Sequence, residues 1–210
     1  QVHSILSLMC GIELLVTPYL NHNLTPYSTL QSSDFTAQES IALPKYTDSN
    51  GIVQTSTVST YAPKIFDHLR KSSGIHTEDF IQSIGITSSL GNLFLGNLSL
   101  YTKQQSAGKS GSSFYTPWDC RYLIKSIPER EAQSLHRILP QLTSYFEKTP
   151  NTFLNRIYGL YQYNNEHFVI LENILDLQIP IHRIYDLKGS TQGRSNDTGS
   201  GILKDLDIRE

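Results

Sequence analysis

A glycine- and serine-rich stretch, QQSAGKSGSSFY, lies at residues 104–115. Small residues of this kind let a backbone close around a phosphate group. A short apolar run follows, YLIKSI, with Lys125 as its one charged residue, and the sequence PERE then supplies Glu129 and Glu131. A lysine can hold phosphate oxygens, and an acid beside it can fix its position. The stretch indicates a phosphate-binding site, and two kinds of loop could build it.

The first kind is the loop of nucleotide-binding proteins that ends in GKS or GKT. That pattern needs a glycine five residues before the glycine of GKS, and a helix directly after the loop. Here GKS begins at Gly108, and position 103 is Lys103. The residues that follow, SFYTP and RYLIK, are typical of strands. Both requirements fail, which excludes this loop.

The second kind is the glycine loop of kinases, a hairpin over ATP that is followed on the next strand by a lysine for the α- and β-phosphates. Lys125 fits this lysine, because period-two alternation puts Leu123, Lys125 and Ile127 on one face of a short strand. Glu129 or Glu131, in the first turn of the next helix, could pair with it. The alternative stays open that Lys125 is an edge-strand lysine and that the glutamates are ordinary charges at a helix terminus.

A third motif, YDLKGSTQGR, lies at residues 185–194. Asp186 and Lys188 share one face of an extended run, and Arg194 follows after small residues. An acid and two bases beside a glycine- and serine-rich backbone could bind a metal–phosphate or an anionic head group. The alternative is a turn with a solvated ion pair.

These motifs depend on elements that the sequence also predicts. A helix is expected near residues 59–74, with Ser59 or Thr60 as its cap and Gly74 as its left-handed stop, and a second helix follows with Thr77 as its cap. Prolines and asparagines predict the boundaries of the later elements. A helix should begin at Pro128, kink at Pro140 and end at Thr149 and Pro150. Asn164 and Asn165 predict a tight turn between two strands.

The order of the elements is helices, strand, helix, hairpin and a last extended run at residues 181–187. This order predicts an α+β fold, an antiparallel sheet with helices packed on it. Residues 1–58 are predicted to be an N-terminal extension and polar linker, largely disordered, and residues 59–210 the domain. Within the extension, the apolar residues 5–16 are too short to cross a bilayer and predict a buried or interfacial helix, with the end of a membrane segment as the alternative.

The charge and the cysteine content of the chain limit the classes of function that it could have. The 210 residues carry a formal net charge of −2, which gives no whole-chain case for binding nucleic acid. The two cysteines, Cys10 and Cys120, make neither a disulfide framework nor a metal-ligand spacing. A reducing compartment is therefore expected, and the protein is expected to be cytoplasmic.

Taken together, the motifs resemble the phosphatidylinositol phosphate kinases, in particular those like phosphatidylinositol-4-phosphate 5-kinase. The resemblance covers residues 61–208 and rests on an ordered set of strings: YAPKIFDHLRKSSGI, EDFIQSI, GKSGSSFY, YLIKSI, EAQSLHRILP, RIYGLYQ, FVILEN, YDLKGST and LKDLD. YDLKGST is specific to this family. The resemblance implies a kinase-like N-lobe followed by the start of a C-lobe, which transfers the γ-phosphate of ATP, with Mg²⁺, to a phosphoinositide at a membrane surface.

The resemblance also implies roles for residues of this chain. Lys125 is the ATP-phosphate lysine, Glu131 rather than Glu129 is its partner, and Asp186 and Lys188 complete the catalytic set. Lys188 and Arg194 face the substrate phosphate. The residues implied to bind ATP are Lys125 with the glycine loop Gly108, Ser110, Gly111, Ser112 and Ser113, and the stretch beside the adenine, Leu171, Glu172 and Asn173.

The family's catalytic string DYSLL and its metal-binding string IID do not occur in this sequence. No metal ligand is therefore assigned within this chain, and the 210 residues alone are expected to be inactive, as an incomplete part of a lipid kinase that makes a bisphosphate from a monophosphate. The alternative is a noncatalytic phosphoinositide- or nucleotide-binding module, or a pseudokinase regulator. The sequence leaves open a homodimer, the identity of the monophosphate, and a membrane region before the domain in the parent protein.

Overall fold

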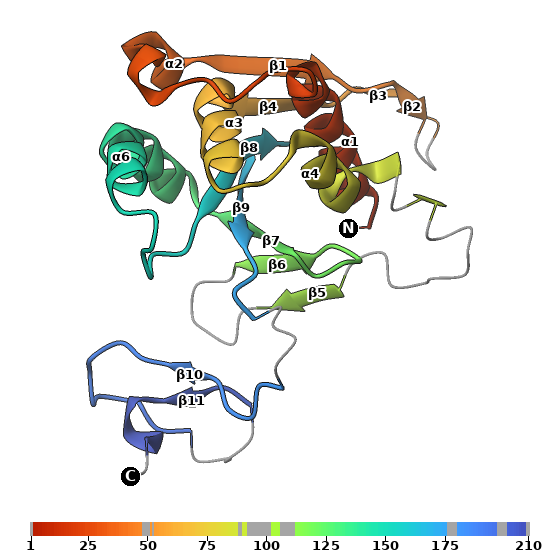
Figure 1. Cartoon of the computed structure of the whole chain (residues 1–210). Helices are drawn as coiled ribbons and strands as arrows, with labels where there is room; N and C mark the ends of the chain where they lie inside the picture. Colours follow the sequence, from red (N-terminus) through yellow and green to blue (C-terminus); the bar gives the residue numbers. More distant parts are fainter. Residues whose placement is uncertain are drawn as a thin grey trace. The chain divides into compact units, whose positions relative to one another are not determined.

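Lys125 lies on β7, the fifth strand in an antiparallel sheet of seven strands with the order β1-β4-β8-β9-β7-β6-β5. Figure 1 shows this sheet. The structure is a computed structural model and describes residues 2–47, 51, 53–87, 90–91, 102–105, 112–175, 180–196 and 201–208. The chain divides into two units, residues 1–173 and residues 174–210. The strands of the sheet are β1 (Gln38–Ala42), β4 (Thr57–Tyr61), β5 (Thr102–Gln105), β6 (Ser113–Thr116), β7 (Tyr122–Ile127), β8 (Ile157–Tyr163) and β9 (Glu166–Glu172).

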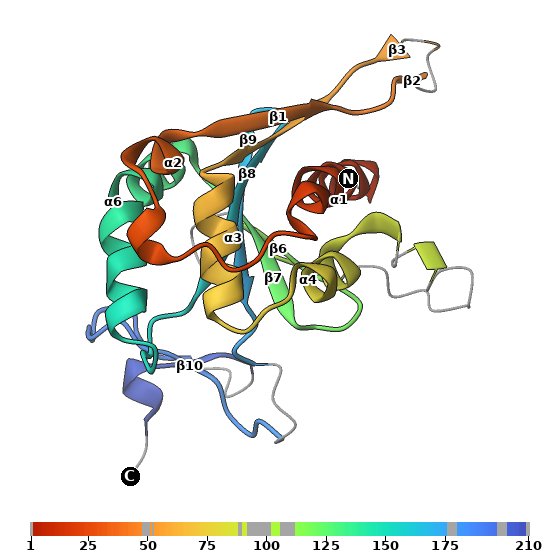
Figure 2. The ribbon, with the colours of Figure 1, turned by 45° about the horizontal axis from the view of Figure 1, so that its top comes forward.

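One face of the sheet packs against α1 (Val2–Val16) and α4 (Thr77–Ile84). Figure 2 shows these two helices on the opposite side of β8 and β9 from α3. The apolar side chains of α1 are buried on this face, among them Leu8, Met9 and Ile12. The prediction of a buried helix over residues 5–16 is therefore confirmed. Among the described residues, no helix has the length and apolar character needed to cross a membrane.

The other face of the sheet packs against α3 (Pro63–Ser72) and α6 (Glu129–Lys148), which share a second apolar cluster. Leu160 of β8 and Val169 of β9 belong to this cluster, together with Leu139 of α6. The chain thus places one helical layer on each face of an antiparallel sheet. The predicted α+β class is confirmed.

The ends of the helices follow local chemistry only in part. Gly74 has a φ of 76° after α3, as predicted for a left-handed stop. The predicted caps are wrong, because Ser59 and Thr60 lie within β4 and Ala62, with a φ of 46°, precedes α3. Thr77 is likewise the first residue of α4 rather than its cap. At Ser59 and Thr60, backbone pairing of β4 with its neighbours takes precedence over a local cap.

Most of the later elements agree with their sequence marks. α6 begins after Pro128 and ends before Thr149, as predicted. It continues through Pro140 as one helix, and the kink predicted there stays a prediction. β8 and β9 are joined by Asn164 and Asn165, whose φ values of 49° and 64° are those of a tight hairpin turn.

The structure differs from the prediction that residues 1–58 are largely disordered. Beside α1, β1 pairs antiparallel with β4 from Gln38 opposite Tyr61 to Ala42 opposite Thr57. Because β1 is an edge strand with mostly exposed polar side chains, its composition resembles that of a linker. Its order comes from backbone hydrogen bonds, which composition does not reveal. The remaining elements of this region are η1 (Thr17–Tyr19), η2 (Tyr27–Thr29), α2 (Ser32–Thr36), and β2 (Tyr46–Thr47) paired with β3 (Val53–Gln54).

The second unit contains a short parallel pair, β10 (Tyr185–Asp186) and β11 (Leu203–Lys204), followed by η3 (Asp205–Asp207). The extended run predicted at residues 181–187 is a strand only at Tyr185 and Asp186.

Candidate functional site

Lys125 and Glu131 come from consecutive elements, β7 and α6. The Nζ atom of Lys125 lies 4.0 Å from Oε2 of Glu131, and the two side chains are 28% and 47% exposed. Pro128 turns the chain between them and accepts the backbone N–H of Glu131 at 2.9 Å. An ion pair this exposed contributes about 0–1 kcal/mol to stability, so its geometry matters more for chemistry than for folding.

The surface around Lys125 combines a cation with apolar side chains, of which Phe114, Leu123 and Leu171 are half-buried and Val169 is buried. Phe114 of β6, Lys125 of β7 and Val169 of β9 are opposite one another across three strands, and therefore lie on the same face of the sheet. Leu123 and Leu171 form the next row on that face. Nζ of Lys125 lies 6.0 Å from the centre of the Phe114 ring. This surface could take a flat apolar ring system beside phosphates.

The glycine loop is described only at its end. Gly108, Ser110 and Gly111 lie outside the described residues. Ser112 is buried. Ser113 donates its backbone N–H to Oγ of Ser126 at 2.8 Å, so the residue after Lys125 anchors the start of β6. Sequence reasoning missed Ser126, because this contact joins a side chain to a backbone group thirteen positions away and has no periodic signature.

The stretch predicted to lie beside the adenine uses its backbone donors within the first unit. Glu172 donates its N–H to the carbonyl of Arg156 at 3.1 Å, and Asn173 donates to that of Arg121 at 3.0 Å. Asn155 donates its side-chain amide to the carbonyl of Glu172 at 3.2 Å. In this arrangement the N–H groups of Glu172 and Asn173 are not available to a base. The role of Leu171, Glu172 and Asn173 stays a prediction.

The second unit brings Asp186, Lys188 and Arg194 together. Lys188 Nζ lies 2.9 Å from Asp186 Oδ1, and Arg194 Nη2 lies 3.3 Å from Asp186 Oδ2. Arg194 also donates to the backbone carbonyl of Asp186. The Lys188 side chain, as hydrogen-bond donor, holds the pKa of Asp186 below its usual value, with Arg194 adding to the effect.

Asp205 is the residue of this unit that sequence reasoning did not assign. Its carboxylate accepts the backbone N–H groups of Lys188 and Gly189 at 3.0 and 2.8 Å, and Nε of Arg194 at 2.7 Å. The Arg194 bond is the main reason that the pKa of Asp205 is held far below its usual range. The string LKDLD contains this residue, but only the fold shows that it holds the KGS turn and Arg194 in place. The assigned roles of Asp186, Lys188 and Arg194 stay predictions.

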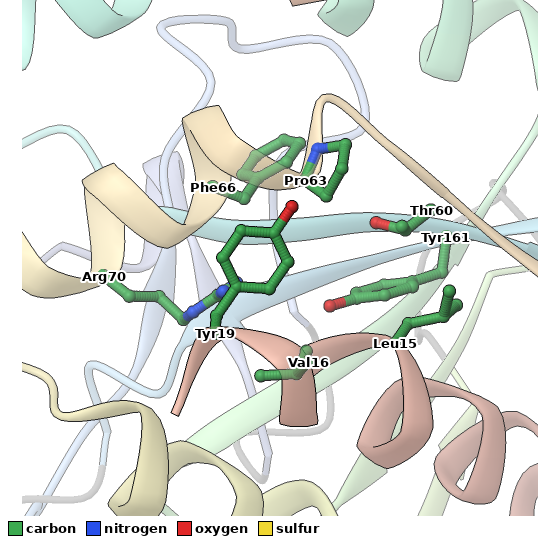
Figure 3. A pocket seen from close by; sticks show the side chains of 8 residues that line it. All are labelled: Leu15, Val16, Tyr19, Thr60, Pro63, Phe66, Arg70 and Tyr161. Atoms are coloured by element: carbon green, nitrogen blue, oxygen red, sulfur yellow. The ribbon is translucent and has the colours of Figure 1, made fainter. Parts of the chain in front are cut away.

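A small cavity of the first unit lies away from Lys125, between α1, η1, α3 and the sheet (Figure 3). About 10 Å³ are open to the centre of a water molecule, and Arg70, Tyr19, Thr60 and Tyr161 are among the lining residues. This is room for about one water molecule and none for a nucleotide. Among the described residues, no group of three histidine, cysteine or acidic side chains could hold a metal ion.

Comparison with known proteins bears on the chemistry of this site. Residues 95–210 match the family model described as phosphatidylinositol-4-phosphate 5-kinase. The chain is 33% identical over 165 residues to a phosphatidylinositol 4-phosphate 5-kinase of Plasmodium falciparum, 34% over 204 residues to a probable phosphatidylinositol phosphate kinase of Dictyostelium discoideum, and 35% over 157 residues to phosphatidylinositol 4-phosphate 5-kinase 9 of Arabidopsis thaliana. These alignments cover 71%, 87% and 70% of this chain, but 10%, 28% and 18% of the relatives.

Proposed function

The chain belongs to the phosphatidylinositol-4-phosphate 5-kinase family, and we therefore propose that it is part of a lipid kinase that transfers the γ-phosphate of ATP to a phosphatidylinositol monophosphate. The relatives named above as 4-phosphate 5-kinases favour phosphatidylinositol 4-phosphate as the acceptor. The chain spans between a tenth and about a quarter of the length of these relatives, so the activity is proposed for the longer protein.

The observation that carries the proposal is the approach of Lys125 to Glu131 on a face lined by apolar side chains. Kinases hold the α- and β-phosphates of ATP with a strand lysine that a helix glutamate keeps in position. Lys125 and Glu131 would do this here, and Phe114, Leu123 and Leu171 would contact the adenosine part. Mg²⁺, when bound with ATP, neutralises charge that develops on the transferred phosphate. We assign it no ligand among the described residues.

In the second unit, Lys188 is the group best suited to a phosphoinositide head group. Its ammonium is exposed and has Asp186 as a carboxylate partner. A basic side chain of this kind adds attraction to the anionic lipids of a cytoplasmic leaflet. We propose that the protein acts at the cytoplasmic surface of a membrane, with this lysine directed to lipid phosphate.

The test is phosphate transfer by the full-length protein from radiolabelled ATP to vesicles that contain the 3-, 4- or 5-monophosphate of phosphatidylinositol. The Lys125→Met variant should lose roughly a hundredfold or more in kcat, which is typical of removing one fixed charge-stabilising group. Lys45→Met, a change at an exposed lysine of the first unit, is the matched control and should leave kcat unchanged. Wild-type turnover by Lys125→Met, or no transfer by the wild type to any of the three lipids, would refute the proposal.

The 210 residues by themselves should show no transfer in the same assay. The strings DYSLL and IID, which the resemblance associates with the catalytic and metal-binding aspartates, do not occur in them. Lipid phosphorylation by this stretch alone would contradict that expectation.

A further inference from the structure

His167 is a buried histidine that the proposed chemistry does not use. It lies on β9, is 7% exposed, and faces the same side of the sheet as Lys125. Its Nε2 lies 3.5 Å from the Tyr61 hydroxyl, which donates to Oε1 of Gln162 at 2.9 Å. Because the Tyr61 proton is used in that bond, its oxygen can accept an N–H from His167. Nδ1 of His167 is buried and has no hydrogen-bond partner among the described residues.

This cluster lies beside the turn that sets the distance between Lys125 and Glu131. His167 is opposite Ile127, the last residue of β7, and Pro128 and the first turn of α6 follow directly. The carboxylate of Glu129, the first residue of α6, acts electrostatically on both His167 and Tyr61. The cluster is therefore adjacent to the segment of chain that carries both members of the ion pair.

The groups around His167 favour a neutral imidazole. Burial lowers its pKa, and the opposing effect of Glu129 is smaller. β7 contributes Ile127 and β8 contributes Gln162, neither of which is charged. Burial also raises the pKa of Tyr61, whose ring lies 6.0 Å from that of His136 on α6. A neutral, hydrogen-bonded group fixes distance and orientation, whereas an apolar side chain at this position would only fill space.

We propose that His167, held by the Tyr61 hydroxyl that Gln162 orients, is a positioning residue that fixes the first turn of α6 against the sheet and so keeps Glu131 beside Lys125. The inference rests on the proposed function, because the distance between Lys125 and Glu131 affects activity only if the protein transfers phosphate. It adds a residue whose effect on catalysis passes through Glu131 without contact to a substrate.

The test uses the full-length protein with ATP and phosphatidylcholine vesicles that contain phosphatidylinositol 4-phosphate. His167→Leu should lower kcat roughly tenfold or more, within the range that a misplacement of about 1 Å can cost, and should leave the KM for lipid unchanged. His167→Gln keeps an N–H donor for Tyr61 and should restore most of kcat. The double variant His167→Leu/Glu131→Gln should be no slower than Glu131→Gln alone, because the histidine acts through that glutamate.

His68→Leu is the matched control. His68 is also buried, but it bonds to Glu147 at the other end of α6, at 2.8 Å, and to the carbonyl of Thr25, also at 2.8 Å. Its loss should lower the melting temperature and leave kcat per folded molecule unchanged. A wild-type kcat for His167→Leu, additive effects in the double variant, or the same kcat loss in His68→Leu would overturn the proposal.

Hydrogen–deuterium exchange separates this inference from the proposed function. In His167→Leu, amides of the first turns of α6 should exchange faster than in the wild type, whether or not the protein phosphorylates lipid. Faster exchange there without any lipid kinase activity in the wild type would support a positioning effect on α6 and refute only the proposed function. Unchanged exchange in this segment would refute the inference itself.

Discussion

Replacement of Arg70 by methionine tests how the first unit is held together. Arg70 lies on α3, and its side chain is 2% exposed. Nη1 donates to the carbonyl of Tyr158 on β8 at 2.8 Å, Nη2 lies 3.5 Å from Oδ1 of Asp67, and the guanidinium lies 4.7 Å from the centre of the Phe80 ring. One side chain thus joins α3, the sheet and α4. Methionine has a similar length and keeps the apolar contacts without the charge.

The expected loss follows from these contacts. Removing one member of a buried ion pair costs about 3–5 kcal/mol, because the other charge is left uncompensated. Here Asp67 retains its ion pair with Lys71, whose Nζ lies 2.8 Å from Oδ2 of Asp67, and this pair reduces the cost. Nε of Arg70 is buried without a hydrogen-bond partner among the described residues, so methionine also relieves a desolvation penalty. With both effects subtracted from the cost of breaking the pair, the expected loss in the free energy of unfolding is about 2–3 kcal/mol.

Urea unfolding followed by tryptophan fluorescence and circular dichroism measures this quantity. Arg137→Met, a change at an exposed arginine of α6, is the control and should stay within about 0.5 kcal/mol of the wild type. A loss below about 1 kcal/mol for Arg70→Met would contradict this expectation. It would mean that the desolvation of the buried arginine cancels the stabilisation from its contacts.

Three further outcomes are expected. Gly159→Ala would put a Cβ atom in steric conflict with Cε2 of Tyr161, and should destabilise the protein by about 1–3 kcal/mol in urea unfolding. Burial lowers the pKa of His167 from its ordinary value of 6.5. The contribution of His167 to stability is therefore present above pH 6.5 and should be lost as the pH falls through the lower folded-state pKa. The free energy of unfolding, measured at a series of pH values with His167→Gln as the reference, tests this pH dependence. Asp205→Asn weakens the bond to Arg194 and should speed amide exchange at residues 186–194 and lower lipid phosphorylation in the full-length protein.

The sequence was informative where chemistry is local. Alternation predicted the shared face of Leu123, Lys125 and Ile127, and the acidic start of the next helix placed a partner within reach of the lysine. Asn164 and Asn165 predicted the β8–β9 turn, because few residues adopt positive φ readily. In each case the physical cause acts within a few residues and leaves a pattern in the sequence.

Contacts over longer separations left no such pattern. Ser126 anchors Ser113, and Asp205 holds Arg194 and the turn at Lys188, through bonds that join side chains to groups eleven to seventeen positions away. The order of β1 depends on pairing with β4 and not on its own polar side chains. These features required the fold, because a hydrogen bond between distant positions imposes no period on the residues between them.

Lys188 and Arg194, to which the sequence assigned the same role toward the substrate phosphate, differ in exposure although both contact Asp186. The Lys188 side chain is 62% exposed, whereas that of Arg194 is 12% exposed and bonded to Asp205 and Asp186. Lys188→Ala should therefore weaken binding to vesicles with phosphatidylinositol 4-phosphate roughly fivefold, the effect of one basic residue near an anionic surface, and leave amide exchange in the unit unchanged. Arg194→Lys should instead speed exchange at residues 186–196 and 201–205, because lysine cannot reproduce the planar fork of arginine. If Arg194→Lys weakens vesicle binding without changing amide exchange, then Arg194 contacts lipid phosphate directly, and its ion pairs with Asp186 and Asp205 break when the lipid binds.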